Sequence, residues 1–321
     1  MLLFSVLMAA PAEPFLDRWL HFLADMAPTG SFFAFTFNLK ALLALVLVSL
    51  SCGAVGALVV GGRMAFFSDA LAHCAFASVS IGFILFTTVV MQFRPQADFW
   101  DWVTPVMLAF GMLVGYGIAY VRERTGLASD TVIGVFFAFA IGLAAMLGKI
   151  MQSRELFRLE DFLFGDPLLV RSEDLIYLLI LAVVTLCALT LSFNQLLLSS
   201  FNPSLARSRR VPIRLLSYLF IMLLALVVNL CVRTVGVLLI NALLVVPAAT
   251  AANVSRNLRQ VFWGTVLLCL ISSLLGQAIS WEIESQTRLR LGIPGTIILV
   301  SVSLFVLSAI VGPLLRDRRA A

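Results

Sequence analysis

Long apolar runs separated by short polar stretches repeat along most of this chain. About 20 apolar residues in a helix cross the hydrocarbon core of a bilayer, and nine of the runs are near that length. They cover residues 41–60, 64–91, 104–121, 131–148, 175–198, 215–232, 235–252, 261–281 and 295–315. They lack the alternating pattern of a membrane β-barrel strand. The pattern therefore predicts an all-α integral membrane protein.

The number of spans depends on the sixth and seventh runs, because only Arg233 and Thr234 separate them. A tight hairpin would make two spans of these runs, whereas a single broken helix would make one. We expect about eight to nine membrane helices, with ten as the upper limit.

The first 38 residues follow a different pattern. The segment Phe15–Met26 would place its apolar residues on one side of a helix and its polar residues on the others, the former being Phe15, Trp19, Phe22 and Leu23 and the latter Asp17, Arg18, His21 and Asp25. This arrangement is typical of a helix lying in the membrane interface. The sequence thus predicts an interfacial, lipid-contacting segment over residues 1–38 and a transmembrane domain over residues 39–321.

Composition supports the membrane assignment. The chain is 61% hydrophobic and 12% charged, whereas soluble domains average about 25% charged residues. Its formal net charge of +5 comes almost wholly from arginines, and basic loops face the cytoplasm. Their distribution favours a cytoplasmic C-terminus. No basic stretch is interleaved with aromatic residues, so nucleic acid is not an expected partner.

Motifs for enzymatic chemistry are absent from the sequence. There is no GxxxxGK[ST] phosphate-binding loop, no HExxH and no GxSxG. The five cysteines lie in apolar runs without CxxC spacing, so we expect them to pack between helices; they are Cys52, Cys74, Cys187, Cys231 and Cys269. The chain is therefore predicted not to be an enzyme and not to hydrolyse nucleotide by itself.

One ionisable pair lies inside the second apolar run. Asp69 and His73 are four residues apart, so a helix presents both on the same face. Ionisable groups inside a membrane usually line a pathway for an ion or a proton. A carboxylate and a neutral imidazole are also ligands for zinc, manganese or iron(II). Asp69 and His73 are our candidate metal-contacting residues. The alternative is a buried hydrogen-bonded pair that ties helices together.

The seventh apolar run carries two residues that disturb a plain apolar helix, Asn241 and Pro247. Proline removes a helix hydrogen bond and bends the segment. Broken membrane helices often lie beside transport sites, although bent helices without such a role are also common. We therefore predict a helix kink near Asn241 and Pro247.

Five stretches together resemble the membrane subunit of bacterial zinc, manganese and iron ATP-binding-cassette (ABC) importers. They are GGRMAFFSDALAHCAFASVSIG (61–82), SDTVIGVFFAFAIGL (129–143), LFGDPLLV (163–170), VGVLLINALLVVPAATA (235–251) and IPGTIILV (293–300). They follow the family's order from about residue 39 to the end. The resemblance implies a permease similar in fold class to the vitamin B12-type (type II) importers.

The resemblance also implies partners and roles. Two permease copies would assemble with two cytoplasmic ATP-binding subunits in the bacterial inner membrane, and an extracytoplasmic solute-binding protein would deliver the metal. Asp69 and His73 match the family's intramembrane metal-contacting pair. The segment that couples the permease to the ATPase aligns with residues 202–214, and its candidate residues are Asn202, Pro203, Leu205, Ala206, Arg207 and Arg210. No resident cofactor is expected, since Zn²⁺ or Mn²⁺ would be the cargo.

Three positions depart from the family pattern. Arg210 stands where glycine is expected, Asn241 where a small hydroxyl residue is more usual, and Ala138 where some zinc-type members carry a second histidine. Gly165 and Asp166 lean toward the zinc-like members. Zinc is therefore the first expectation for the cargo and manganese the second.

The resemblance thus implies a permease that imports divalent transition metal ions by ATP-driven alternating access. The alternative function is a proton- or ion-coupled secondary transporter that uses Asp69 and His73 as a relay and needs no ATPase.

Overall fold

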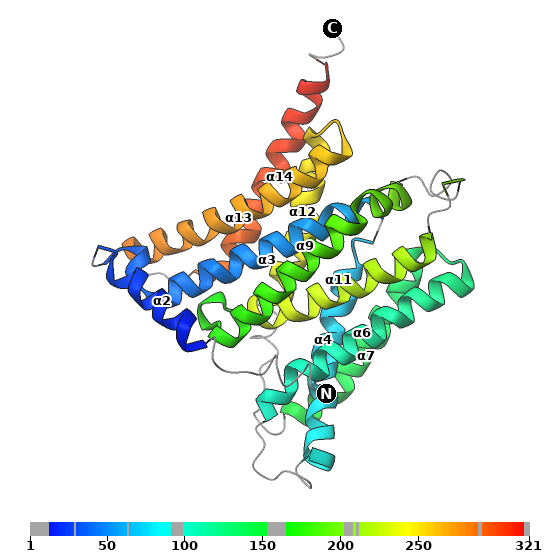
Figure 1. Cartoon of the computed structure of the whole chain (residues 1–321), viewed down its shortest axis with the longest axis horizontal. Helices are drawn as coiled ribbons and strands as arrows, with labels where there is room; N and C mark the ends of the chain where they lie inside the picture. Colours follow the sequence, from blue (N-terminus) through cyan, green and yellow to red (C-terminus); the bar gives the residue numbers. More distant parts are fainter. Residues whose placement is uncertain are drawn as a thin grey trace.

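The computed structural model describes residues 13–28, 30–62, 64–90, 99–152, 165–201, 208–209, 212–287 and 291–317. All regular elements in these ranges are helical (Figure 1). The α-helices are α2 (Glu13–Asp25), α3 (Thr36–Gly61), α4 (Phe67–Leu85), α6 (Phe99–Thr125), α7 (Ser129–Gln152), α9 (Ser172–Phe201), α11 (Ile213–Val235), α12 (Val237–Val254), α13 (Leu258–Thr287) and α14 (Ile293–Asp317). Short helical turns are η1 (Phe32–Ala34), η2 (Phe86–Val90) and η3 (Pro167–Leu169).

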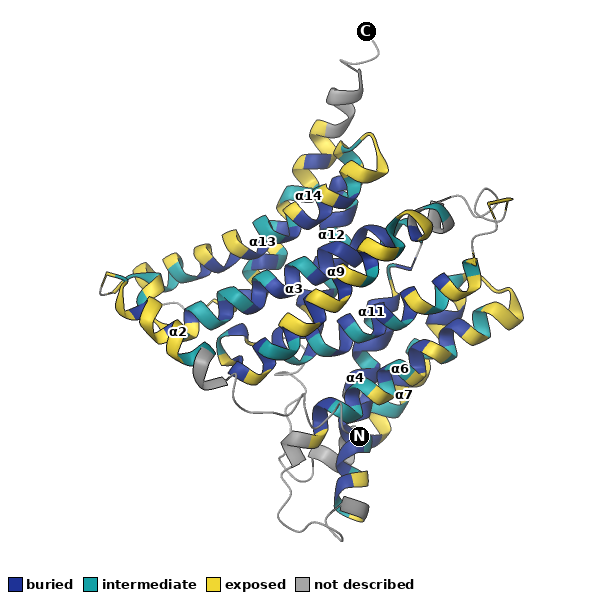
Figure 2. Cartoon of the chain, in the orientation of Figure 1, coloured by how far each residue is buried: buried dark blue, intermediate teal, exposed yellow. Residues whose placement is uncertain are grey.

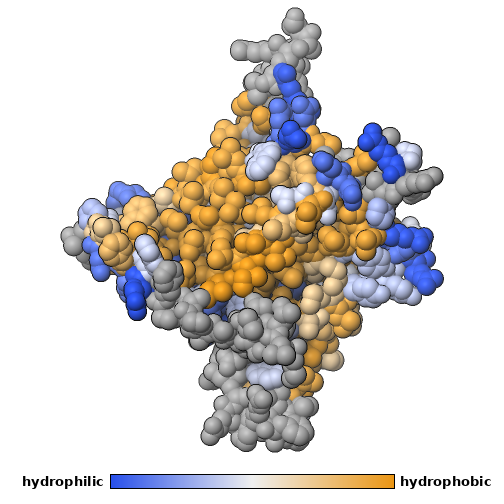
Figure 3. Space-filling model, in the orientation of Figure 1, coloured by the Kyte–Doolittle hydropathy of each residue, from blue (hydrophilic) through white to orange (hydrophobic). Residues whose placement is uncertain are grey.

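Within the described part of the chain, nine helices are long and apolar enough to cross a membrane. They are all the α-helices except α2, and each overlaps one of the nine apolar runs. Figure 3 shows apolar side chains over the sides of these helices and hydrophilic side chains near several of their ends. The prediction of an all-α membrane protein with about nine spans is therefore confirmed.

Helix α3 forms the centre of the bundle and packs against α9, α12 and α13 (Figures 1 and 2). Its buried residues include many small ones, among them Ala44, Ser49, Ser51, Cys52, Gly53, Ala54 and Gly56. Small side chains allow membrane helices to approach closely, so that packing and interhelical hydrogen bonds hold them together. One such bond joins the hydroxyls of Ser49 and Ser273 on α13, which lie 2.7 Å apart.

Helices α11 and α12 show that the sixth and seventh apolar runs form two spans and not one broken helix. They are two separate helices joined by a single residue, Gly236, whose φ of 85° lies in the left-handed region. Glycine adopts this conformation without the steric cost that a Cβ atom would add. Helix α12 continues through Pro247, so the break in the chain lies at Gly236 and the kink at Asn241 and Pro247 stays a prediction.

Four of the five cysteines are buried, as the sequence predicts. All five are free, but Cys187 on α9 is exposed, so the packing prediction is wrong for that residue. The thiol of Cys269, for example, donates to the main-chain oxygen of Leu243, 3.2 Å away, and so links α13 to α12. The four buried cysteines therefore serve packing and not cross-linking.

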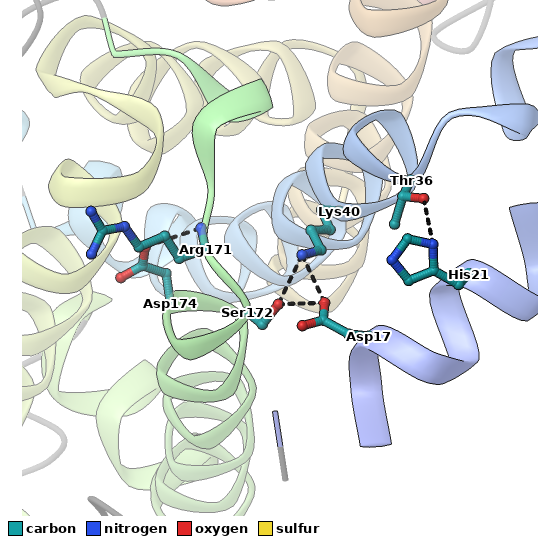
Figure 4. Close-up of polar contacts among 7 residues, drawn as sticks. All are labelled: Asp17, His21, Thr36, Lys40, Arg171, Ser172 and Asp174. Atoms are coloured by element: carbon teal, nitrogen blue, oxygen red, sulfur yellow. Dashed lines mark hydrogen bonds and ion pairs between the residues drawn. The ribbon is translucent and has the colours of Figure 1, made fainter. Parts of the chain in front are cut away.

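Helix α2 lies across the N-terminal ends of α3 and α9, and polar contacts fasten it there (Figure 4). The Asp17 carboxylate lies 2.7 Å from the Lys40 ammonium of α3 and accepts a 2.6 Å hydrogen bond from the Ser172 hydroxyl of α9. His21 lies 3.3 Å from the Thr36 hydroxyl. The aromatic residues Trp19 and Phe22 of α2 are exposed on another side. Helix α2 is thus amphipathic, and its place in the membrane interface stays a prediction. Thr36, where α3 begins, already lies within the expected segment 1–38.

We expect Gly56→Ala to destabilise the bundle, because a Cβ atom at Gly56 would lie 2.6 Å from the main-chain oxygen of Leu244 in α12. A main-chain atom cannot move away alone, so α3 and α12 would have to separate, at a cost of about 1–3 kcal/mol. Thermal unfolding in detergent should show a lower midpoint than that of the unsubstituted chain. The control is Gly295→Ala on α14, where a Cβ atom would meet no neighbour. Equal midpoints for the two variants would contradict the close α3–α12 packing.

We expect Asp17→Asn to weaken the attachment of α2 to α3 and α9 and to leave the rest of the helix bundle unchanged. Hydrogen bonds from Lys40 and Ser172 lower the pKa of Asp17 below its ordinary value of 3.8. A lowered pKa means that the stabilisation is complete above 3.8 and is lost only as the pH falls through the lowered value. Because Asp17 is partly exposed, the ion pair contributes about 1 kcal/mol or less.

Hydrogen exchange of the α2 amides in detergent, corrected for the intrinsic rate, measures this effect. At pH 7, exchange should be up to about fivefold faster in Asp17→Asn than in the unsubstituted chain. Arg18→Gln, at an exposed position of the same helix, is the control. Equal exchange in Asp17→Asn and the unsubstituted chain would show that Asp17 is not held as described.

Candidate functional site

The sequence-predicted pair lies at the start of α4. Asp69 is in the first turn of the helix and His73 one turn later. Asp69 Oδ1 lies 3.6 Å from His73 Nδ1. The structure therefore brings the two predicted side chains together on one face of α4.

The hydrogen bond of His73 determines which of its ring nitrogens is available. Its Nδ1 lies 2.9 Å from the main-chain oxygen of Asp69. Because a carbonyl oxygen only accepts, Nδ1 carries the proton, and Nε2 of the neutral ring keeps its lone pair. Such a bond on the other nitrogen is the usual way of orienting a metal-ligating histidine. The ring is also held by an edge-on contact with Phe137 of α7, with 5.0 Å between centroids.

Asn241 joins this pair from α12, which is 172 positions further along the chain. Its side-chain Nδ2 donates a 2.8 Å hydrogen bond to Asp69 Oδ1. Its Oδ1 is buried and has no hydrogen-bond partner among the described residues. Sequence reasoning connected Asn241 with a helix kink and missed this contact. The only signal in the sequence was an amide inside an apolar run, which cannot reveal which helix it faces.

The pair occupies the partly exposed stripe of a helix that is otherwise largely buried. The side chains of Asp69 and His73 are 34% and 27% exposed, whereas Phe67, Leu71, Ala72 and Cys74 are fully buried. Cys74 therefore does not belong to the site, although it follows His73 directly. The two polar side chains are partly exposed and therefore remain accessible to an ion or to a neighbouring molecule.

One chain offers few donors for a metal. The described residues contain no group of three or more His, Cys, Asp and Glu side chains that could hold an ion. Asp69 and His73 supply one carboxylate and one imidazole, which are suitable ligands for zinc and manganese. A complete coordination shell would need other groups, from water, from Asn241 or from a second molecule.

The predicted coupling residues lie outside the described part of the chain. They are Asn202, Pro203, Leu205, Ala206, Arg207 and Arg210. Beside this segment, Arg214 at the start of α11 forms an ion pair with Glu123 of α6, with 3.0 Å between Nε and Oε1. A cavity of about 310 Å³ lies there and is lined by both residues, by Arg122 and by Ser217. Its position, near the C-terminal end of α3, is at the opposite end of α3 from α2.

Comparison with protein families gives a match over most of the chain. The model of the ABC 3 transport family matches residues 34–312. Among curated proteins, the chain is 30% identical over 288 residues to the manganese import system permease protein ScaB of Streptococcus parasanguinis, covering 89% of this chain and 95% of ScaB. It is 27% identical over 276 residues to a Haemophilus influenzae protein named "Probable iron transport system membrane protein", covering 85% of this chain and 93% of that one.

Two solved structures are similar to the whole bundle. PsaBC from Streptococcus pneumoniae in complex with Fab contains a chain with a TM-score of 0.67 and 28% identity, covering 85% of this chain and 91% of that one. An inward-facing metal-chelate type ABC transporter gives a TM-score of 0.66 at 16% identity, covering 92% and 99%. The second likeness concerns the fold alone. Together they confirm the predicted fold class.

Proposed function

The chain belongs to the ABC 3 transport family, and we propose that it imports divalent transition metal ions across the bacterial inner membrane. It is the permease subunit of an ABC transporter and not the ATPase, so it is not itself an enzyme. The observation that carries the proposal is the Asp69–His73 pair on the accessible stripe of α4. Ionisable side chains are costly in membrane spans and are usually found along ion pathways.

A homodimer would complete the proposed site. The Asp69 carboxylate and the His73 imidazole are partly exposed, and beside a lipid acyl chain they would lack polar partners. A second copy of the chain or a water-filled path would supply such partners. Two copies related by a two-fold axis would place two Asp69–His73 pairs around one ion, which gives up to four protein ligands. The small number of ligands per chain supports such a shared and readily emptied site.

Manganese is the cargo that the relatives favour. ScaB is named for manganese import and the Haemophilus influenzae protein for iron transport, and neither name refers to zinc. We therefore place Mn²⁺ before Zn²⁺, the reverse of the order expected from the sequence. A carboxylate with one imidazole suits either ion, since oxygen ligands suit manganese and imidazole suits zinc.

Transport in this proposal is alternating access driven by ATP hydrolysis in two copies of a partner subunit. A solute-binding protein delivers the ion from outside, Asp69 and His73 replace part of its hydration shell, and closure by the ATPase opens the cytoplasmic side. The segment that includes Asn202, Arg207 and Arg210 would transmit that closure. Nine spans are an odd number, so an extracytoplasmic N-terminus of α3 would go with a cytoplasmic C-terminus, which is the orientation that the arginine distribution favours. Family membership favours this mechanism over the ion-coupled alternative.

We expect Asp69→Asn and His73→Ala each to lower ATP-dependent Mn²⁺ uptake by about tenfold or more, because each removes a ligand of the ion. Radiolabelled Mn²⁺ and Zn²⁺ uptake is measured in cells that express the chain with its partner ATPase and binding protein, at matched membrane levels. His21→Ala is the control, since His21 is the only other histidine. Normal uptake by both site variants would refute the proposed pathway.

We expect two copies of the chain to purify together. Two differently tagged forms are co-expressed with the partner subunits, extracted in mild detergent and captured through one tag. The second tag should be recovered in a comparable amount, and mixing separately extracted samples is the control. Recovery of a single tagged form with the ATPase would exclude the homodimer.

A further inference from the structure

We propose that Asn241 is a third ligand of the transported ion and shifts the preference of the site toward manganese. In the metal-free site its amide nitrogen donates to Asp69, and in the loaded site its carbonyl oxygen binds the ion. This inference rests on the proposed function, since it concerns the same site.

The position of the amide supports this role. Asn241 Nδ2 lies 2.8 Å from Asp69 Oδ1, with α12 and α4 in contact. Neighbouring oxygen ligands of an octahedral ion, each about 2.1 Å from the metal, lie about 3 Å apart. If the amide oxygen took the place of Nδ2, its distance from Asp69 Oδ1 would match the distance between two neighbouring oxygen ligands of one ion.

The unpaired oxygen supports it as well. Asn241 Oδ1 is buried and without a hydrogen-bond partner among the described residues. Leaving a buried acceptor unpaired is destabilising, so an arrangement that keeps Asn241 Oδ1 unpaired calls for a physical reason. Rotation about the terminal side-chain bond exchanges Oδ1 and Nδ2 without moving the backbone. It brings the oxygen next to Asp69, where two oxygens would repel each other unless a cation lay between them.

The exchange would suit a transport site. While the site is empty, the amide N–H satisfies the Asp69 carboxylate. When the ion enters, the carbonyl oxygen adds a ligand, and when it leaves, the N–H returns and competes with rebinding. A carbonyl oxygen beside a carboxylate makes the site richer in oxygen, which suits Mn²⁺ better than Zn²⁺.

The decisive variant is Asn241→Leu, which keeps the approximate volume and removes both polar atoms. Loss of a ligand should lower Mn²⁺ uptake by about tenfold, with a smaller loss for Zn²⁺, so that the Mn²⁺/Zn²⁺ uptake ratio falls. Asn253→Leu is the matched control, because Asn253 lies on the same helix and its side chain donates to the neutral hydroxyl of Ser308, 3.1 Å away. Its ratio should remain that of the unsubstituted chain.

A second variant distinguishes the loss of a ligand from misfolding of the protein. Asn241→Asp has the same shape but only oxygen atoms, so two carboxylates would face the ion. Equilibrium Mn²⁺ binding to the purified complex, measured from the electron paramagnetic resonance signal of the free ion, should become tighter while uptake becomes slower. A structural role alone would not strengthen binding.

Three outcomes would overturn the inference. Equal loss of Mn²⁺ and Zn²⁺ uptake in Asn241→Leu would show that Asn241 has only a structural role. An unchanged Mn²⁺/Zn²⁺ uptake ratio in Asn241→Leu, together with unchanged Mn²⁺ binding in Asn241→Asp, would show that Asn241 does not bind the ion. Absence of ATP-dependent uptake in the unsubstituted complex would refute the proposed function itself, and that failure is seen without any variant at Asn241.

Discussion

Polar groups that lie within an apolar bilayer must find partners inside the protein, and this constraint organises the whole site. Asp69 meets the requirement through the amide of Asn241. His73 meets it through the main-chain oxygen of Asp69. The same requirement applies at the ends of the spans, where Lys40 finds Asp17 and Ser172. Each of these contacts joins elements far apart in the sequence or fixes a side chain within one helix.

Close packing around α3 is what makes the contact between Asp69 and Asn241 possible. Gly56 lets α3 approach the main chain of α12 at Leu244, three residues after Asn241. Helix α12 in turn contacts α4, which carries Asp69. Hydrophobic attraction between helices is weak in lipid, so this geometry depends on small residues that fit together. The composition of α3 therefore influences a site to which α3 contributes no ligand.

The sequence predicted the helices well and their mutual arrangement poorly. Apolar run length alone indicated the nine spans, since a bilayer sets the length of its helices. Helical periodicity placed Asp69 and His73 on one face. It could not show that Asn241 faces Asp69, because contacts between helices depend on packing and not on local pattern. The link at Gly236 was equally ambiguous, since one glycine suffices to end one helix and begin another. The coupling segment around Arg207 lies outside the described residues and stays a prediction.

The incompleteness of the site within one chain is itself informative. A structural metal site closes around its ion with a full set of ligands, whereas a transported ion must bind well enough to enter and weakly enough to leave. One carboxylate, one imidazole and a nearby amide are too few to trap an ion, yet their partial exposure on α4 allows a second set to approach. In the proposed homodimer, such an arrangement would place control over binding in the contact between the two copies. Motion that separates the copies would then weaken the proposed site without any change inside either chain.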